Sequence, residues 1–226
     1  MNTGVRHYMA SQFGTSYHFK PIIRYTSDTG ELQMPFEKSG HRVEQTVPDE
    51  ELVSRAKQRD SDAWAELYDC YVERVYHYIL ARIRNTMVAE DLTEQVFMKA
   101  LNSIGSFTWQ GDPFVAWLFR ISHNLVVDFY RKPSTREQPL VDWDLPLSGS
   151  DPVEVAETKI TLEIVLKELD KLSPGQRQAV ELRFIADLSI EETAQVMGKR
   201  PGAVRALQHK AIESLRRLLA MRGKNG

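Results

Sequence analysis

The chain of 226 residues has a single cysteine, Cys70. One thiol excludes an intramolecular disulfide and a cysteine-cluster metal site, and it is typical of a reducing cytosol. The sequence also has no apolar run long enough to cross a bilayer, and its N-terminus lacks the basic-then-apolar layout of a signal peptide. These absences predict a soluble cytoplasmic protein without membrane insertion.

Sequence features of an enzyme are also missing. We find no carboxylate pair at catalytic spacing, no His/Cys cluster and no glycine-rich phosphate loop. His7, His18 and His41 do not have the spacing of metal ligands. We therefore expect no catalytic residue, no metal and no cofactor.

Charge is distributed unevenly along the chain, although the net charge is only −2. Residues 171–226 hold 11 Lys and Arg against 5 Asp and Glu, whereas residues 133–170 hold 3 against 9. A basic C-terminal segment on a neutral-to-acidic body indicates that one end binds a polyanion. Ordinary solvation of exposed helices explains the acidic part equally well.

Helical periodicity predicts an all-α fold in two domains. Residues 1–47 show no sustained period and predict a mobile extension, and we expect no strand anywhere. Residues 48–132 predict a four-helix bundle with Trp64 in its core. Residues 133–151 contain three prolines and mostly acidic charges, which predicts a flexible linker. Residues 152–222 predict the second domain, with capping boxes that begin at Ser173 and Ser189.

Two helices joined by a tight turn are predicted near the C-terminus. Ala194 provides a small residue where the helices approach, and Gly198 provides the positive φ of the turn. Val204 and Leu207 then form the buried side of the second helix, which starts at Pro201. Its other side carries basic residues suited to the DNA major groove, with a solvated basic helix as the alternative. These residues are Arg200, Arg205, His209 and Lys210.

The helix predicted from Pro113 to Lys132, which Asp112 would cap, has two distinct faces. One face is apolar and belongs to the core, whereas the other carries polar residues at four-residue spacing. The polar set is Arg120, Asn124 and Asp128, with His123, Arg131 and Lys132 beside it. Phe107 and Trp109 precede the helix in a loop that we expect to be exposed. Amides read base edges and aromatic rings stack on bases, so this surface suits unpaired bases; capping and salt bridges explain it equally well.

The order of these motifs resembles the extracytoplasmic-function (ECF) class of bacterial RNA polymerase sigma factors, a branch of the sigma-70 family. "AEDLTEQVFMKAL" (Ala89–Leu101) is similar to the family's polymerase-binding segment. "WLFRISHNLVVDFYRK" (Trp117–Lys132) is similar to the helix that melts and reads the −10 element. "LSPGQRQAVELRF" (Leu172–Phe184) and the helix pair after it resemble the region that reads the −35 element. The similarity covers about residues 48–220, in order.

The resemblance implies a promoter-specificity subunit, with sigma region 2 in residues 48–132 and sigma region 4 in residues 152–222. Its partners would be core RNA polymerase (the β′ clamp helices and the β subunit), promoter DNA and, in many family members, an anti-sigma factor. The implied polymerase contacts are Asp91, Leu92, Glu94, Gln95 and Phe97. The implied −10 contacts are Phe107, Trp109, Arg120, His123, Asn124, Asp128, Arg131 and Lys132. The implied −35 contacts are Arg200, Arg205, Ala206, His209 and Lys210.

Two departures from the family pattern affect these expectations. Glu94 precedes Gln95, whereas relatives often have the opposite order, and Arg200 stands where many relatives have a Ser or Thr helix cap. A conventional helix-turn-helix regulator that binds an operator by itself is the alternative. That reading gives no role to the polar face of the helix predicted from Pro113 to Lys132.

Overall fold

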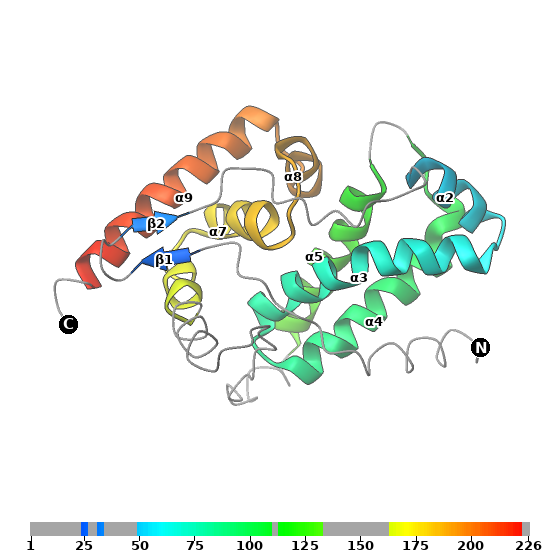
Figure 1. Cartoon of the computed structure of the whole chain (residues 1–226), viewed down its shortest axis with the longest axis horizontal. Coiled ribbons are helices and arrows are strands. Elements are labelled where there is room, and N and C mark those ends of the chain that lie inside the picture. Colours follow the sequence, from blue (N-terminus) through cyan, green and yellow to red (C-terminus); the bar gives the residue numbers. More distant parts are fainter. Residues whose placement is uncertain (1–23, 27–30, 34–48, 110–112, 133–162, 223–226) are drawn as a thin grey trace.

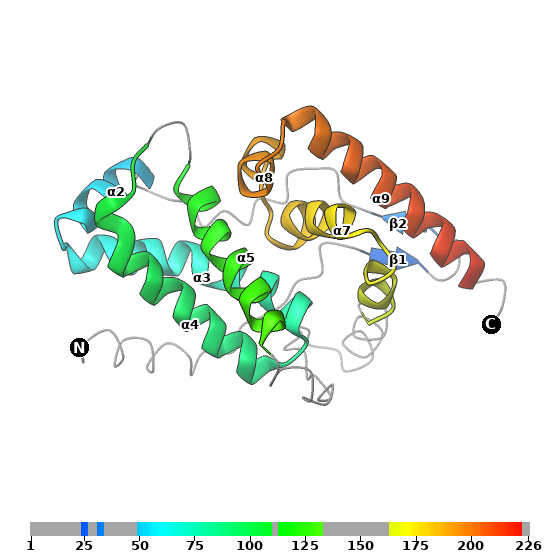
Figure 2. The same cartoon turned by 180° about the vertical axis from the view of Figure 1, so that it is seen from behind.

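The computed structural model describes residues 24–26, 31–33, 49–109, 113–132 and 163–222. The first domain contains α2 (Asp49–Lys57), α3 (Ser61–Ile83), α4 (Thr86–Ser103), the short 3-10 helix η1 (Ile104–Ser106) and α5 (Phe114–Arg131). The second contains a helical stretch at 163–169, then α7 (Pro174–Val180), the π-helical turn η3 (Glu181–Ile185), α8 (Ile190–Met197) and α9 (Pro201–Arg222). Figures 1 and 2 show the two helical domains side by side. The predicted all-α fold is confirmed for both domains.

A short hairpin is the one departure from this fold class among the described residues. Strands β1 (Arg24–Thr26) and β2 (Glu31–Gln33) pair antiparallel, with Tyr25 opposite Leu32. The expectation that no strand would occur was wrong here, because strands of three residues are too short to give a readable alternation. The rest of the predicted extension and the whole predicted linker lie outside the described residues.

Side-chain caps set several of the helix boundaries. Asp60 Oδ1 accepts hydrogen bonds from the backbone N–H groups of Asp62 (2.9 Å) and Ala63 (3.2 Å), so α3 begins at Ser61. The capping boxes predicted at Ser173 and Ser189 are both present. At the second, the Ser189 N–H donates to Glu192 Oε2 at 2.6 Å, and the Glu192 N–H donates to Ser189 Oγ at 3.1 Å.

The start of α5 differs by one residue from the prediction. Pro113 has extended backbone angles and is the N-cap, so the helix begins at Phe114. The predicted cap, Asp112, lies outside the described residues. Proline still suits this position, because it lacks the N–H that a helix start leaves without an intrahelical partner.

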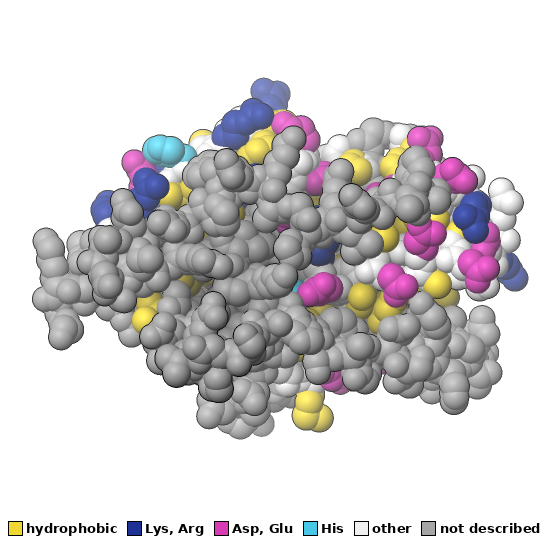
Figure 3. Space-filling view, in the orientation of Figure 1, with side chains coloured by type: hydrophobic (Ala, Val, Ile, Leu, Met, Phe, Trp, Pro, Cys, Tyr) yellow, Lys and Arg dark blue, Asp and Glu magenta, His cyan; other side chains and the backbone are white. Residues whose placement is uncertain are grey.

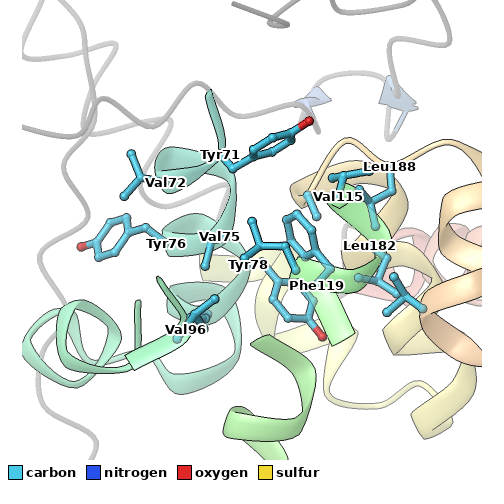
Figure 4. Packing of buried hydrophobic residues seen from close by; sticks show 14 of the residues in the cluster. Tyr71, Val72, Val75, Tyr76, Tyr78, Val96, Val115, Phe119, Leu182 and Leu188 are labelled. Atoms are coloured by element: carbon cyan, nitrogen blue, oxygen red, sulfur yellow. The ribbon is translucent and has the colours of Figure 1, made fainter. Parts of the chain in front are cut away.

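The core is continuous between the two domains. Trp64 is 8% exposed, which confirms its predicted core position. Further along the bundle, α5 packs against α8, and α3 packs against η3. Figure 4 shows Val115 and Phe119 of α5 facing Leu182 and Leu188 of the second domain, and all four are buried. The domains are therefore docked through an apolar contact rather than held only by the connecting chain.

His77 of α3 makes the stability of the bundle depend on pH. The side chain is 9% exposed, and burial lowers its pKa from 6.5 to about 4. Unfolding frees the imidazole to bind a proton, so the free energy of unfolding should fall as pH drops through 6.5 toward 4. We expect a loss of about 2–3 kcal/mol between about pH 7.5 and 4.5 from this group.

Urea unfolding of the wild type and of His77→Gln at the two pH values measures this effect. Since glutamine does not titrate, the variant should lose less stability on acidification, and the difference between the two chains isolates His77. An identical pH dependence in both chains would mean that the pKa of His77 is the same in the folded and the unfolded protein. His123 also has a lowered pKa, so some pH dependence should remain in the variant.

Candidate nucleic-acid interface

The helix-turn-helix has the predicted geometry. Gly198 ends α8 with φ +61° and ψ 37°, and its N–H donates to the carbonyl oxygens of Ala194 and Gln195. Ala194 is 3% exposed and Val204 is fully buried. A side chain at position 198 would be strained at this φ, although there is open space around it. Local geometry therefore fixes how α9 leaves the turn.

Four of the five predicted −35 residues lie on the outward side of α9, and Arg200 immediately precedes this helix. They are all exposed: Arg200, Arg205, Ala206, His209 and Lys210. Figure 3 shows Lys, Arg and His side chains along this edge, whereas mostly Asp and Glu lie over the opposite end of the molecule. Arg205 Nη2 lies 3.2 Å from Glu191 Oε1, and His209 Nδ1 lies 3.6 Å from Glu213 Oε2. These pairs are exposed, so they hold the Arg205 and His209 side chains only weakly.

On α5 the structure separates the predicted −10 residues into two groups. Asn124, Asp128, Arg131 and Lys132 are exposed, and Arg120 is half-buried. The Asp128 carboxylate lies 3.9 Å from the Arg131 guanidinium. This group forms an accessible polar face beside the core face of the same helix.

His123 belongs to the contact between the domains and not to that open face. Its Nδ1 lies 3.2 Å from the Tyr78 hydroxyl and 3.3 Å from Nε2 of Gln178, which is on α7 of the second domain. Burial, with a smaller contribution from Arg82, lowers the pKa of His123 to about 4, so the ring is neutral near pH 7. Its predicted role at the −10 surface is therefore not available while the domains are docked.

In the loop before α5, the structure corrects the expectation about the exposure of Phe107. Phe107 is 4% exposed, so the prediction that it lies on an exposed loop was wrong. Its ring contacts Trp109, Phe114 and Trp117, with centroid distances of 5.2, 5.9 and 5.1 Å. Trp109 is half-buried against the same core, and residues 110–112 lie outside the described part of the chain. Phe107 is thus a packing residue that anchors the start of α5.

The predicted polymerase-binding residues on α4 likewise divide by exposure. Asp91 and Gln95 are exposed and Glu94 is half-buried. Leu92 is 6% exposed and Phe97 is 1% exposed. The last two face the core, because they follow the apolar period of α4, so a direct contact with a partner is corrected to a packing role for both.

Sequence reasoning missed Met87, which lies one turn before Asp91 on the same exposed side of α4. It is 75% exposed, the larger of the two values for exposed large apolar residues in the described chain. Methionine is flexible and polarizable, and it is over-used at binding surfaces. The available signal was an apolar residue at a position where the helical period required a polar one.

Two features are absent from the described residues. None of their helices is long and apolar enough to cross a membrane. The same part of the chain contains no group of three or more His, Cys, Asp and Glu side chains that could hold a metal ion.

The protein is thus a two-domain helix-turn-helix protein, in which a helical bundle is docked to the helix-turn-helix and each domain has an exposed polar face. Comparison with known proteins gives the family. The model for sigma-70 region 2 matches residues 67–136, and the model for sigma-70 region 4 matches residues 169–217. Together they span just over half of the chain. The chain belongs to the sigma-70 family of RNA polymerase sigma factors.

Its curated relatives include ECF-class sigma factors. The ECF RNA polymerase sigma factor BldN of Streptomyces coelicolor is 40% identical over 171 residues, which cover 75% of this chain and 65% of BldN. SigX of Bacillus subtilis is 29% identical over 67% of this chain and 80% of its own length. The chain thus spans just under two thirds of BldN.

Solved structures support the same fold. CnrH, solved in complex with the cytosolic domain of CnrY, is 24% identical with a TM-score of 0.61, over 76% of this chain and 97% of CnrH. RpoE of Bartonella quintana, solved in complex with the anti-sigma factor NepR, is 25% identical with a TM-score of 0.53, over 69% of this chain and 96% of that chain.

Proposed function

We propose that this sigma factor binds core RNA polymerase in the cytoplasm and directs initiation at a specific set of promoters, without catalysis of its own. The observation that carries the proposal is the pair of exposed polar faces on two domains of sigma type. One face lies on the recognition helix α9 and the other on α5. The first suits duplex DNA, and the second suits the bases of a melted strand.

The −35 element would be read as duplex by α9. An α-helix fits the major groove, where an arginine guanidinium bonds bidentately to guanine. Arg205 is the exposed arginine in the middle of this face, and its partner Glu191 is itself exposed and easily displaced by DNA. Arg200 and Lys210 lie beside it and would bind phosphates.

Core polymerase would bind the exposed side of α4, through the acidic residues and Met87. Acidic groups with one apolar anchor favour a partner surface that is basic and partly apolar. The NepR complex of the RpoE relative supports an anti-sigma factor as a further partner of this chain. Both partners are proteins, which agrees with the net negative charge of the first domain, where residues 48–132 hold 10 Lys and Arg against 13 Asp and Glu.

Run-off transcription from fragmented genomic DNA tests the function. Core polymerase is supplied with and without the protein, and transcripts are sequenced from their 5′ ends. New start sites that share paired −35 and −10 elements are the expected result. Tight binding of the protein alone to a palindromic duplex, without new starts, would instead identify a conventional regulator.

Asn124→Ala should slow open-complex formation while leaving polymerase binding intact. Asn124 is exposed on α5, and its amide is suited to hydrogen bonding with the edge of an unpaired base. Losing such a contact costs about 1–3 kcal/mol, roughly a 5- to 150-fold effect. Permanganate reactivity of promoter thymines measures the open complex, and Asn102→Ala, an exposed asparagine on α4, is the matched control. Equal open-complex formation in Asn124→Ala and the wild type would remove Asn124 from the −10 contact.

A further inference from the structure

Three arginines of the first domain extend to the second domain and bond only oxygen atoms there. Arg74 Nε lies 3.0 Å from the Ala186 carbonyl oxygen, and its Nη2 lies 2.9 Å from that of Asp187. Arg82 Nη1 lies 3.3 Å from Glu181 Oε2, and Glu181 is fully buried.

Arg84 repeats this pattern at the end of α3. Its Nη2 lies 2.8 Å from Asp170 Oδ2 and 2.7 Å from the Leu166 carbonyl oxygen. Two carboxylates and three carbonyls of the second domain thus occupy the arginine surface, defined here as Arg74, Arg82 and Arg84. Carboxylate and phosphate oxygens are interchangeable partners for a guanidinium.

Contacts within the first domain hold these side chains in place. The Arg74 guanidinium lies over the rings of Tyr71 and Phe119, 5.5 and 5.9 Å from their centroids. Arg82 lies 5.9 Å from the Tyr78 ring centroid and donates to its hydroxyl at 3.2 Å. Because these partners belong to α3 and α5, the guanidinium groups of Arg74 and Arg82 stay oriented when the second domain leaves.

The surface also has hydrogen-bonding capacity that the docked state does not use. The Nε atoms of Arg82 and Arg84 are buried and have no hydrogen-bond partner among the described residues. A buried donor without an acceptor is costly, so these groups favour a partner that offers more acceptor oxygens. A phosphate group offers such oxygens in a tetrahedral arrangement.

The arginine surface adjoins the predicted −10 helix. The Tyr78 hydroxyl links Arg82 to His123, and the Tyr130 hydroxyl donates to the Arg82 backbone carbonyl. His123 immediately precedes Asn124. DNA that reaches Asn124 would therefore carry its backbone close to Arg82.

Promoter binding requires the domains to separate. If the proposed function holds, the chain contacts elements about 25 base pairs apart, which is ~85 Å of B-form duplex. In the docked state α5 packs directly against α8, the first helix of the helix-turn-helix. A compact chain of this size has a radius of gyration of only about 17 Å, so it cannot contact both elements while docked.

We propose that Arg74, Arg82 and Arg84 form a binding surface for the phosphate backbone of promoter DNA, and that the second domain of the same chain covers this surface in the free protein. The carboxylates of Glu181 and Asp170 occupy the positions that DNA phosphates take in the initiation complex. The proposal rests on the proposed function.

Salt dependence of promoter binding tests the DNA contact. The full chain is assembled with core polymerase, and the affinity for a fluorescent promoter fragment is measured over a salt series. Affinity falls as salt rises, and each lost phosphate contact makes the slope of log affinity against log salt less steep by about 0.9. We expect this decrease for Arg74→Gln and for Arg82→Gln, and recovery of the slope in Arg82→Lys. Arg59→Asn is the matched control, because Arg59 is an exposed arginine with φ 66°, a conformation that asparagine tolerates, in the turn before α3.

Energy transfer between dyes tests the covering. Cysteines replace the exposed Lys99 and Arg216 in a Cys70→Ser background, and transfer is measured in the free protein. Glu181→Gln should lower the transfer while leaving the salt slope of the polymerase complex unchanged, and Arg82→Gln should lower both. Asp170→Asn replaces Glu181→Gln if that variant does not fold.

Unchanged salt slopes in both arginine variants would overturn the proposal and leave these side chains as domain contacts only. Transfer in the free wild type as low as in the polymerase complex would overturn the covering. If the wild-type protein gives no polymerase-dependent promoter binding at all, the proposed function itself fails, and this inference fails with it. A wild-type protein that binds promoters, with variants whose slopes are unchanged, shows that only this inference has failed. A wild-type protein that does not bind promoters shows that the proposed function has failed.

Discussion

Replacing Phe97 by alanine should lower the free energy of unfolding by about 3–5 kcal/mol. The side chain is 1% exposed, and its ring packs edge-to-face against Tyr68 with centroids 4.7 Å apart. The ring of Trp64 also packs edge-to-face against the ring of Phe97, with centroids 6.3 Å apart. Removal leaves a cavity between α3 and α4, because a packed core relaxes only partly around a lost ring. Urea unfolding followed by circular dichroism measures the change.

The control for Phe97 is on the same helix. Gln95→Ala removes an exposed side chain two residues away, so it should change stability by less than about 0.5 kcal/mol. Affinity for core polymerase, measured well below the unfolding midpoint, should fall in Gln95→Ala if α4 presents its exposed side to the polymerase. A Phe97→Ala protein that is as stable as the wild type but no longer binds polymerase would reverse the packing assignment.

Phe107→Ala should produce a loss of similar size, again about 3–5 kcal/mol. Its ring is surrounded by three other aromatic rings, and Lys57 Nζ lies 5.7 Å from its centroid. The cluster joins α2, the loop after η1 and the start of α5, so its loss should loosen all three. Thermal unfolding of the variant against Thr108→Ala, an exposed neighbour, gives the comparison. Full stability combined with defective open complexes would restore Phe107 to a role on the DNA.

Signals within a few residues of one another predicted the helices well. The capping boxes at Ser173 and Ser189 and the left-handed Gly198 are all present, because each depends only on local hydrogen bonds and backbone angles. The core positions of α5 followed for the same reason. Phe114, Leu118 and Leu125 repeat at helical spacing, and all are buried.

The burial of side chains that are covered by residues far away in the sequence was predicted poorly. Phe107 stands in a short segment with glycine and polar neighbours, and nothing local indicates that the rings of α5 enclose it. His123 is next to the exposed Asn124, yet Gln178, 55 residues later, contacts its ring. Sequence spacing identifies which side of a helix is polar, but it does not identify which other domain covers that side.

The predicted polymerase-binding segment shows a different reason for error. Its residues alternate between the core and the exterior within one turn, so a family motif read as a contact surface includes packing residues. Leu92 and Phe97 hold α4 in the bundle, whereas Asp91 and Gln95 remain accessible. A motif can therefore be specific for a family although only half of its side chains can touch a partner.

The π-helical turn Glu181–Ile185 sets the rotational phase between the two halves of the second domain. The Ala186 N–H donates to the Glu181 carbonyl at 3.0 Å, five residues back, where an α-helix would use a spacing of four. The turn therefore contains one more residue than α-helical winding would. If the same residues wound as an ordinary α-helix instead, with the extra residue kept, everything that follows would turn by about 100° about the helix axis. Such rewinding would separate the register of Arg177 and Glu181 from that of Leu188 and α8, so the angle at which α9 is presented depends on how one extra residue is wound.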